Sequence, residues 1–179
     1  MAGDPPIDVE HRTRFDALFD RHYAAVRAYV ARRSGTTGVV DDVLSETFLV
    51  AWRRIDSVPA DGLPWLLGVA RRVLANQRRG EVRRGALVEL LAGMLPRGPI
   101  AEPAGEVFGE LADALAALSP REREALLLVA WEGLDPQRAA RVVGCAPAAF
   151  RARLYRARRR LVAQLELTPD EARLTEEAR

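Results

Sequence analysis

DPQRAARVVGCAPAAFRARLYRARRRLVAQL, residues 135–165, is the stretch that decides the fold. It contains eight arginines between Arg138 and Arg160 and no acidic residue after Asp135. Asp135 followed by Pro136 predicts a helix start, because an aspartate side chain accepts hydrogen bonds from unpaired N–H groups and proline has no N–H to pair. The stretch is therefore expected to be helical and strongly basic.

The same stretch contains a break between two helices. Gly144 predicts the end of a short helix through Val143, because glycine readily adopts the left-handed conformation that closes many helices. A second helix is expected to begin near Pro147 and to run toward Leu165. Two helices joined by so short a turn predict a helix-turn-helix.

The second helix of this pair has distinct faces when its residues are placed at about 100° intervals. Five apolar residues form one narrow stripe that must pack on the body of the domain: Phe150, Leu154, Ala157, Leu161 and Leu165. The opposite face consists of Ala148, Ala152, Tyr155, Arg156 and Arg159. Two arginines border the stripe on each side, Arg151 and Arg158 on one and Arg153 and Arg160 on the other.

This arrangement favours DNA binding by the second helix. A helix that enters a major groove needs short side chains that permit close approach and long donors that reach base edges, while flanking arginines hold the phosphates. The alternative interpretation is a solvated basic helix face. The coupling to a helix-turn-helix favours the DNA-binding interpretation.

Charge is distributed unevenly along the chain. The 179 residues include 27 basic residues, all arginine, yet the formal net charge is only +2. A second basic block, residues 71–84, has six arginines against Glu81 alone, whereas residues 166–179 carry more acidic than basic side chains. Two basic blocks on a nearly neutral chain predict two contacts with a polyanion.

The residue types exclude several kinds of site. Cys145 is the single cysteine, so no disulfide can form within the chain. His11 and His22 are the two histidines, and there is no cysteine pair to complete a zinc site. We expect no metal, no cofactor and no catalytic residue. No signal peptide or membrane-spanning apolar run is recognisable, which predicts a soluble cytoplasmic protein without membrane insertion.

Periodic apolar residues predict an all-α fold of two small helical domains, with no convincing strand. Helices are expected over residues 10–33, 39–55, from Leu63 or Pro64 onward, over 107–118 and through Trp131. The last of these begins with a capping box formed by Ser119, Pro120, Arg121 and Glu122.

The helix over 39–55 has one apolar and one acidic face. Its apolar residues are Val43, Leu44, Phe48, Leu49 or Ala51, and Trp52. Its other face shows Asp41, Asp42, Ser45 and Glu46.

Glycines and prolines after Gly85 predict a boundary between the two domains. We expect a disordered N-terminus over residues 1–9, a first domain over 10–84, a flexible linker over 85–106, a second domain over 107–165 and an acidic C-terminal tail over 166–179.

Three motifs in this order resemble a known family. DDVLSETFLVAW at 41–52 resembles a polymerase-binding helix, WLLGVARR at 65–72 resembles a promoter-melting helix, and LSPRERE at 118–124 with VGC at 143–145 and the arginines beyond resembles a promoter-reading domain. The resemblance spans roughly residues 12–165, with these motifs in order and at the family's spacing. On these motifs the chain resembles bacterial RNA polymerase sigma factors of the extracytoplasmic-function class, within the sigma-70 family.

The resemblance implies a role for each domain. Region two would bind core RNA polymerase through Asp41, Asp42, Glu46 and Phe48. It would also bind the minus-ten element, with a flipped base against the loop over 56–62 and contacts from Arg71, Arg72, Asn76, Arg78 and Arg79. Region four would bind the minus-thirty-five element through Arg151, Ala152, Arg153, Tyr155, Arg156, Arg159 and Arg160. Besides core polymerase and promoter DNA, the resemblance implies an anti-sigma factor as partner.

Two other functions compete with a transcription initiation factor. A stand-alone helix-turn-helix regulator would need a dimerisation face or an effector pocket, and would leave the basic block over 71–84 without a role. A small enzyme, such as a recombinase or phosphotransferase, would need a nucleophile or a glycine-rich phosphate loop. The sequence shows neither, so we expect no enzymatic activity.

Overall fold

The structure is a computed structural model that describes residues 9–34, 37–92 and 106–177. The described residues form helices and turns and contain no strand, which confirms the predicted all-α fold. The chain divides into two compact units, residues 1–98 and 99–179. This division falls inside the segment predicted as a linker, and the exact domain limits stay a prediction. The predictions for residues 1–8 and 93–105 lie outside the described residues.

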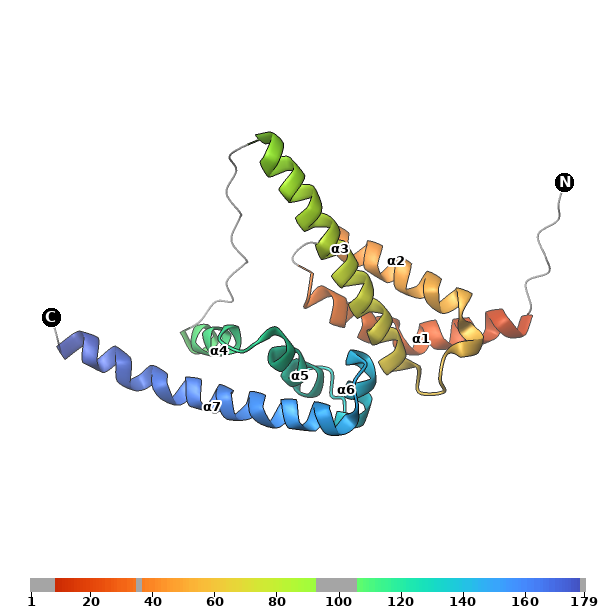
Figure 1. The fold of residues 1–179 in the computed structure, drawn as a ribbon. Helices are drawn as coiled ribbons and strands as arrows, with labels where there is room; N and C mark the ends of the chain where they lie inside the picture. Colours follow the sequence, from red (N-terminus) through yellow and green to blue (C-terminus); the bar gives the residue numbers. More distant parts are fainter. Residues whose placement is uncertain (1–8, 35–36, 93–105, 178–179) are drawn as a thin grey trace. The chain divides into compact units, whose positions relative to one another are not determined.

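The first unit contains three long helices and one short 3-10 turn. The helices are α1 (Val9–Ala31), α2 (Thr37–Arg53) and α3 (Gly62–Ala92), and the 3-10 turn is η1 (Ile55–Ser57). Each helix packs against the other two, and η1 packs on α1 (Figure 1). Residues three and four apart meet in the core, as the apolar period predicted, among them Val26, Val30, Val43 and Leu66.

The apolar pattern of α2 is compatible with either Leu49 or Ala51 in the core, and packing decides between them. Ala51 is fully buried, whereas Leu49 is 46% exposed. At about 100° per residue Leu49 lies roughly 20° from Asp42 and 60° from Glu46, on the side away from Val43 and Ala51. The apolar leucine therefore belongs to the outer face and the small alanine to the core.

Gly62 begins α3 at a point where the chain passes close to α1. A Cβ atom at this position would lie 2.5 Å from Leu18 Cδ1, which is closer than real Cβ contacts allow. The missing side chain thus lets Leu18 pack against the start of α3.

The second unit is built around its last helix. Its helices are α4 (Glu106–Ala116), α5 (Pro120–Ala130), α6 (Pro136–Val143) and α7 (Pro147–Glu177), and α4, α5 and α6 all pack on α7 (Figure 1). Phe150 and Ala157 of the predicted stripe are fully buried, Leu154 is 4% exposed, and Leu161 is half-buried.

The predicted helix-turn-helix is present as α6 and α7. Asp135 Oδ1 accepts hydrogen bonds from the N–H groups of Gln137 and Arg138, at 2.8 and 2.9 Å. Gly144 has a φ of 70° and closes α6, with its N–H and that of Cys145 both directed to the Ala140 carbonyl. Both ends of α6 therefore follow from residues that the sequence displays.

Two helices are longer than expected. α3 continues to Ala92, into the segment predicted as a flexible linker, and α7 continues to Glu177 rather than ending near Leu165. A single glycine costs a helix only about 1 kcal/mol, and the neighbouring arginine, leucine, alanine and glutamate residues favour helix strongly enough to continue it.

Candidate nucleic-acid interface

The outward face of α7 presents the side chains that the sequence assigned to DNA. Six of the seven are exposed: Arg151, Ala152, Tyr155, Arg156, Arg159 and Arg160. Tyr155 is 62% exposed although it is a large aromatic residue. The helix therefore has a broad outer surface with short residues between long donors, which is the shape that a major groove accepts.

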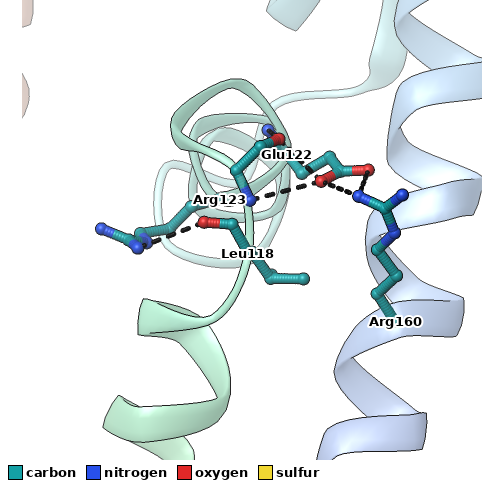
Figure 2. Close-up of polar contacts among 5 residues, drawn as sticks. Leu118, Glu122, Arg123 and Arg160 are labelled. Carbon is teal, nitrogen blue, oxygen red and sulfur yellow. Dashed lines mark hydrogen bonds and ion pairs between the residues drawn. The ribbon is translucent and has the colours of Figure 1, made fainter.

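The two arginines on one flank of α7 differ in their surroundings. Arg153 is half-buried beside the core stripe. Arg160 has a side chain that is 62% exposed, and its Nη1 atom donates to both carboxylate oxygens of Glu122, at 3.0 and 2.8 Å (Figure 2). The sequence assigned phosphate binding to both residues, and the structure adds a carboxylate partner for Arg160.

Glu122 is the centre of this contact. It lies in the first turn of α5, and its side chain is only 7% exposed. Its Oε2 atom accepts from Ser119 Oγ at 2.6 Å and from the Ser119 N–H at 3.3 Å, while Ser119 Oγ accepts from the Glu122 N–H. This confirms the predicted capping box. The hydrogen bond from Ser119, helped by the Arg160 guanidinium and opposed by burial, holds the pKa of Glu122 below its ordinary value of 4.5.

Arg123 joins the two helices next to this site. Its Nε donates to the Leu115 carbonyl at 2.6 Å, and its Nη2 donates to the carbonyls of Ala116 and Leu118 at 2.7 and 3.3 Å. Figure 2 shows its side chain reaching Leu118, while the neighbouring Glu122 points toward Arg160. One guanidinium thus donates to carbonyls of the last turn of α4 and of Leu118 beyond it, and connects the turn to α5.

The predicted minus-ten residues of α3 divide into two groups. Arg72, Asn76 and Arg79 share one side of the helix, because they are four and three residues apart. Arg79 Nη2 donates to Asn76 Oδ1, which orders these two side chains together. Arg71 and Arg78 lie roughly 100° around the helix.

Arg78 makes a contact within the unit. Its Nη2 donates to the carbonyl of Arg33 beyond the end of α1, and the Arg33 guanidinium lies 3.7 Å from the centre of the Tyr29 ring. Arg78 therefore connects α3 to the end of α1.

A hollow of about 270 Å³ lies between α1 and the loop after η1. Arg14, Leu18, Arg21 and His22 line it from α1, and Val58 and Pro59 line it from the loop. Arg14 Nη1 pairs with Asp56 Oδ1 at 3.0 Å and so links η1, directly before the loop, to α1. The sequence pointed to the loop over 56–62 but missed the residues from α1, because their proximity depends on how α1 and η1 pack.

The outer face of α2 combines acidic side chains with one apolar residue. Asp41, Asp42 and Glu46 are exposed, as predicted, and the exposed Leu49 lies among them. Phe48, also predicted for this surface, is only 5% exposed. Its ring packs against the rings of Phe19 and Tyr23, with centroids 4.7 and 6.0 Å away. Phe48 therefore supports the helix from inside, and Leu49 is the large apolar residue exposed on this face.

The described parts of the chain show neither a metal cluster nor a membrane-spanning helix. No group of three or more histidine, cysteine, aspartate or glutamate side chains there is arranged to hold a metal ion. Within the same residues, no helix is both long and apolar enough to cross a membrane.

Comparison with known proteins gives matches in both units. A family model described as sigma-70 region 2 matches residues 18–84, and one described as sigma-70, region 4 matches residues 108–161. The two matches appear in the same order as the sequence motifs at 41–72 and 118–160.

Two curated relatives show the same similarity across most of the chain. The ECF RNA polymerase sigma factor EcfG of Rhodopseudomonas palustris is 35% identical over 158 residues, which cover 84% of this chain and 86% of EcfG. The ECF RNA polymerase sigma factor BldN of Streptomyces coelicolor is 32% identical over 170 residues, which cover 89% of this chain. The chain spans 62% of the length of BldN.

A solved structure has a similar fold. The sigma factor RpoE of Bartonella quintana, in complex with the anti-sigma factor NepR, matches with a TM-score of 0.62 and 27% identity, over 85% of this chain and 96% of RpoE.

Proposed function

The chain belongs to the sigma-70 family of RNA polymerase sigma factors, in the extracytoplasmic-function class, and from this premise we propose that it binds core polymerase and directs it to promoters. Region two lies in the first unit and region four in the second. The observation that carries the proposal is the presence of both regions, in order, each matching its own unit of the structure. A stand-alone regulator would use only the second unit.

Region four would read the minus-thirty-five element with α7. Ala152, Tyr155 and Arg156 are exposed on the outer side of the helix, opposite Phe150 and Leu154, and the exposed Arg151 borders that side. Arg156 has the length and the donors to reach guanine edges, and Tyr155 can lie against a thymine methyl group. Arg153 and Arg160 on one flank, and Arg159 further along the outer face, would hold phosphates.

Region two would hold the minus-ten element along α3 and the loop after η1. Arg72, Asn76 and Arg79 share one side of α3 and can follow a strand backbone. The hollow between α1 and the loop has apolar side chains at Leu18 and Val58 and cationic ones at Arg14 and Arg21. This combination suits a base turned out of the stack together with its phosphate.

The polymerase contact would use the acidic face of α2. Asp41, Asp42 and Glu46 are exposed there and can pair with arginines of a partner, and Leu49 can enter an apolar pocket between them. The chain would act in the cytoplasm, where core polymerase works, and would carry no enzymatic activity of its own.

An anti-sigma factor is the second protein partner in this proposal. The support is the similar sigma factor RpoE, whose structure contains the anti-sigma factor NepR. Such a partner can cover either unit without unfolding it, because each unit has its own core.

Run-off transcription tests the proposal. Purified core polymerase with the full chain, on a library of genomic promoter fragments, is expected to give transcripts that share two sequence elements at fixed spacing. Polymerase without the chain gives the background. Absence of new transcripts from a folded, polymerase-bound chain would refute the proposal, and sequence-specific DNA binding without polymerase would support the stand-alone regulator instead.

A further inference from the structure

We propose that Glu122 is a positioning residue for DNA binding: it holds the Arg160 guanidinium at α7 so that its remaining N–H groups meet a DNA phosphate. The inference rests on the proposed role of region four, which it deepens by assigning a function to an acidic residue on a different helix from the DNA-facing arginines. Nothing in the sequence pattern of α7 indicates that residue.

The geometry of the ion pair leaves part of Arg160 available. Only Nη1 contacts Glu122, at 2.8 and 3.0 Å, so the N–H groups of Nη2 and Nε are not used by the pair within the described part of the chain. Arg160 lies one helical turn beyond Arg156 and about 40° around α7 from it. The guanidinium therefore flanks the face that Arg156 presents, on the side where α5 lies (Figure 2).

The carboxylate itself is held in place from the other side. Ser119 donates to Glu122 Oε2 through both its hydroxyl and its backbone N–H. Glu122 is 7% exposed, while Arg160 is 62% exposed. A fixed, buried acceptor next to an exposed donor restrains the long arginine side chain before DNA arrives, so less conformational freedom is lost when a phosphate binds.

The proposal predicts that neutralising Glu122 changes the affinity for DNA in the direction opposite to that expected from charge alone. A carboxylate near a phosphate backbone repels it, so neutralising an acidic residue of a DNA-binding domain is expected to tighten binding. If Glu122 positions Arg160, neutralising it loosens binding. If the ion pair serves the fold alone, neutralisation lowers stability but leaves the affinity of the folded protein unchanged or improves it.

Glu122→Gln separates these cases. Glutamine also occupies this position of a capping box, so the start of α5 is preserved while the ion pair with Arg160 is removed. Asp113→Asn is the matched control, because Asp113 is exposed on α4 in the same unit and the substitution removes the same charge.

The measurement is the dissociation constant of the reconstituted holoenzyme for duplex promoter DNA at several salt concentrations. Five proteins are compared with the unchanged chain: Glu122→Gln, Arg160→Ala, the double variant of these two, Asp113→Asn and Arg156→Ala. Thermal unfolding of each full chain establishes that all are folded at the assay temperature. We expect Glu122→Gln and Arg160→Ala each to weaken binding about five-fold, as the loss of one hydrogen bond of typical net strength would, and the double variant to bind no more weakly than Arg160→Ala.

Several outcomes would overturn the proposal. Tighter or unchanged binding by Glu122→Gln, as in the Asp113→Asn control, would show that the carboxylate serves only the fold. Additive losses in the double variant would show that Glu122 acts independently of Arg160. If Arg160→Ala had no effect while Arg156→Ala weakened binding, the positioning role would fail and the proposed function would stand. If the unchanged holoenzyme had no promoter preference, the proposed function would fail and this inference with it.

Discussion

At the scale of single residues, arginines that share one helix have different surroundings. Arg156 is exposed on the outer face of α7, Arg153 is half-buried, and Arg160 is paired with Glu122. The helical period predicted which arginines point outward. It could not predict the ion pair, because Arg160 and Glu122 are 38 residues apart in the sequence and meet only when α5 packs on α7.

Arg156→Ala should remove base reading rather than general attraction to DNA. We expect a loss of about 1–3 kcal/mol on the preferred minus-thirty-five sequence and relaxed discrimination at one or two base pairs. The measurement is selection of a randomised duplex library by the holoenzyme. Arg153→Ala is the comparison, since removing a side chain that binds only phosphate should weaken all sequences equally and reduce the salt dependence by about one counterion. An intact base preference in Arg156→Ala would mean that α7 enters the groove in another orientation.

Ionisation of Glu122 should make the free energy of unfolding of the chain depend on pH. Its folded-state pKa is lowered from 4.5, chiefly by the hydrogen bond from Ser119, so the charged form stabilises the fold. That stabilisation is fully present above the ordinary pKa of 4.5 and is lost as pH falls through the lowered value. Thermal unfolding at several pH values should show Glu122→Gln less stable than the unchanged chain near neutral pH, with the difference shrinking in acid below the ordinary pKa. A difference that stayed constant down to the most acidic pH would contradict the assignment.

At the scale of helices, the ends that local chemistry determines were predictable. The capping box of α5 and both ends of α6 follow from Ser119, Asp135 and Gly144. The C-terminal ends of α3 and α7 were not predictable in this way. A glycine such as Gly85 in α3 ends a helix only when the neighbouring residues do not favour helix. Residue type alone left the choice between Leu49 and Ala51 open, and packing of α2 on α1 and α3 decided it.

Gly144→Ala should destabilise the helix-turn-helix. With φ at 70°, an alanine would adopt the left-handed conformation at a cost of about 1–2 kcal/mol, even though no atom lies within 4 Å of the added Cβ. Gly38→Ala is the control, because Gly38 lies within α2, has equally open surroundings and is not at positive φ, so alanine should stabilise the chain by about 1 kcal/mol. The measurement is denaturant unfolding of the full chain. Equal effects of the two substitutions would refute the strain at Gly144.

The acidic face of α2 should be required for polymerase binding but not for folding. Asp42→Arg with Glu46→Arg replaces two exposed charges and should weaken core binding at least about ten-fold, since repulsion takes the place of two ion pairs. Asp16→Arg with Asp20→Arg is the matched control, because these exposed residues have the same spacing on α1. Titration of labelled chain with core polymerase measures the affinity, and circular dichroism monitors helicity. Equal affinities for the two double variants would remove α2 from the interface.

At the scale of the whole molecule, each of the two units has its own core, so a regulatory protein can cover one unit without unfolding the other. Region two and region four each match one unit, and each unit buries its own apolar residues. The number of domains and their order were predictable from glycine, proline and helical period. The hollow beside α1 was not predictable, since it depends on packing between α1 and a loop that follows α2 in the sequence.

In cells that do not need the activity of this chain, a regulatory protein should be bound to it. We expect an anti-sigma factor whose binding excludes core polymerase, because both would use exposed surfaces of the same units. Affinity purification of the tagged full chain from its native cells under non-inducing conditions, followed by mass spectrometry, should recover this partner. A competition assay should then show core polymerase and the partner displacing one another. Recovery of polymerase subunits alone would count against this form of regulation.

The division of the chain after Gly98 also has a consequence during protein synthesis. Ribosomes release the N-terminal part first, and domains generally fold as units in that order. The helices α1, α2 and α3 pack on one another, so the first unit has its complete core before α7 has been translated. A growing or truncated chain would then carry the acidic face of α2 without a recognition helix. Such a product would bind polymerase without reading the minus-thirty-five element, so incomplete translation would produce a competitor of the full chain as well as reduce its amount.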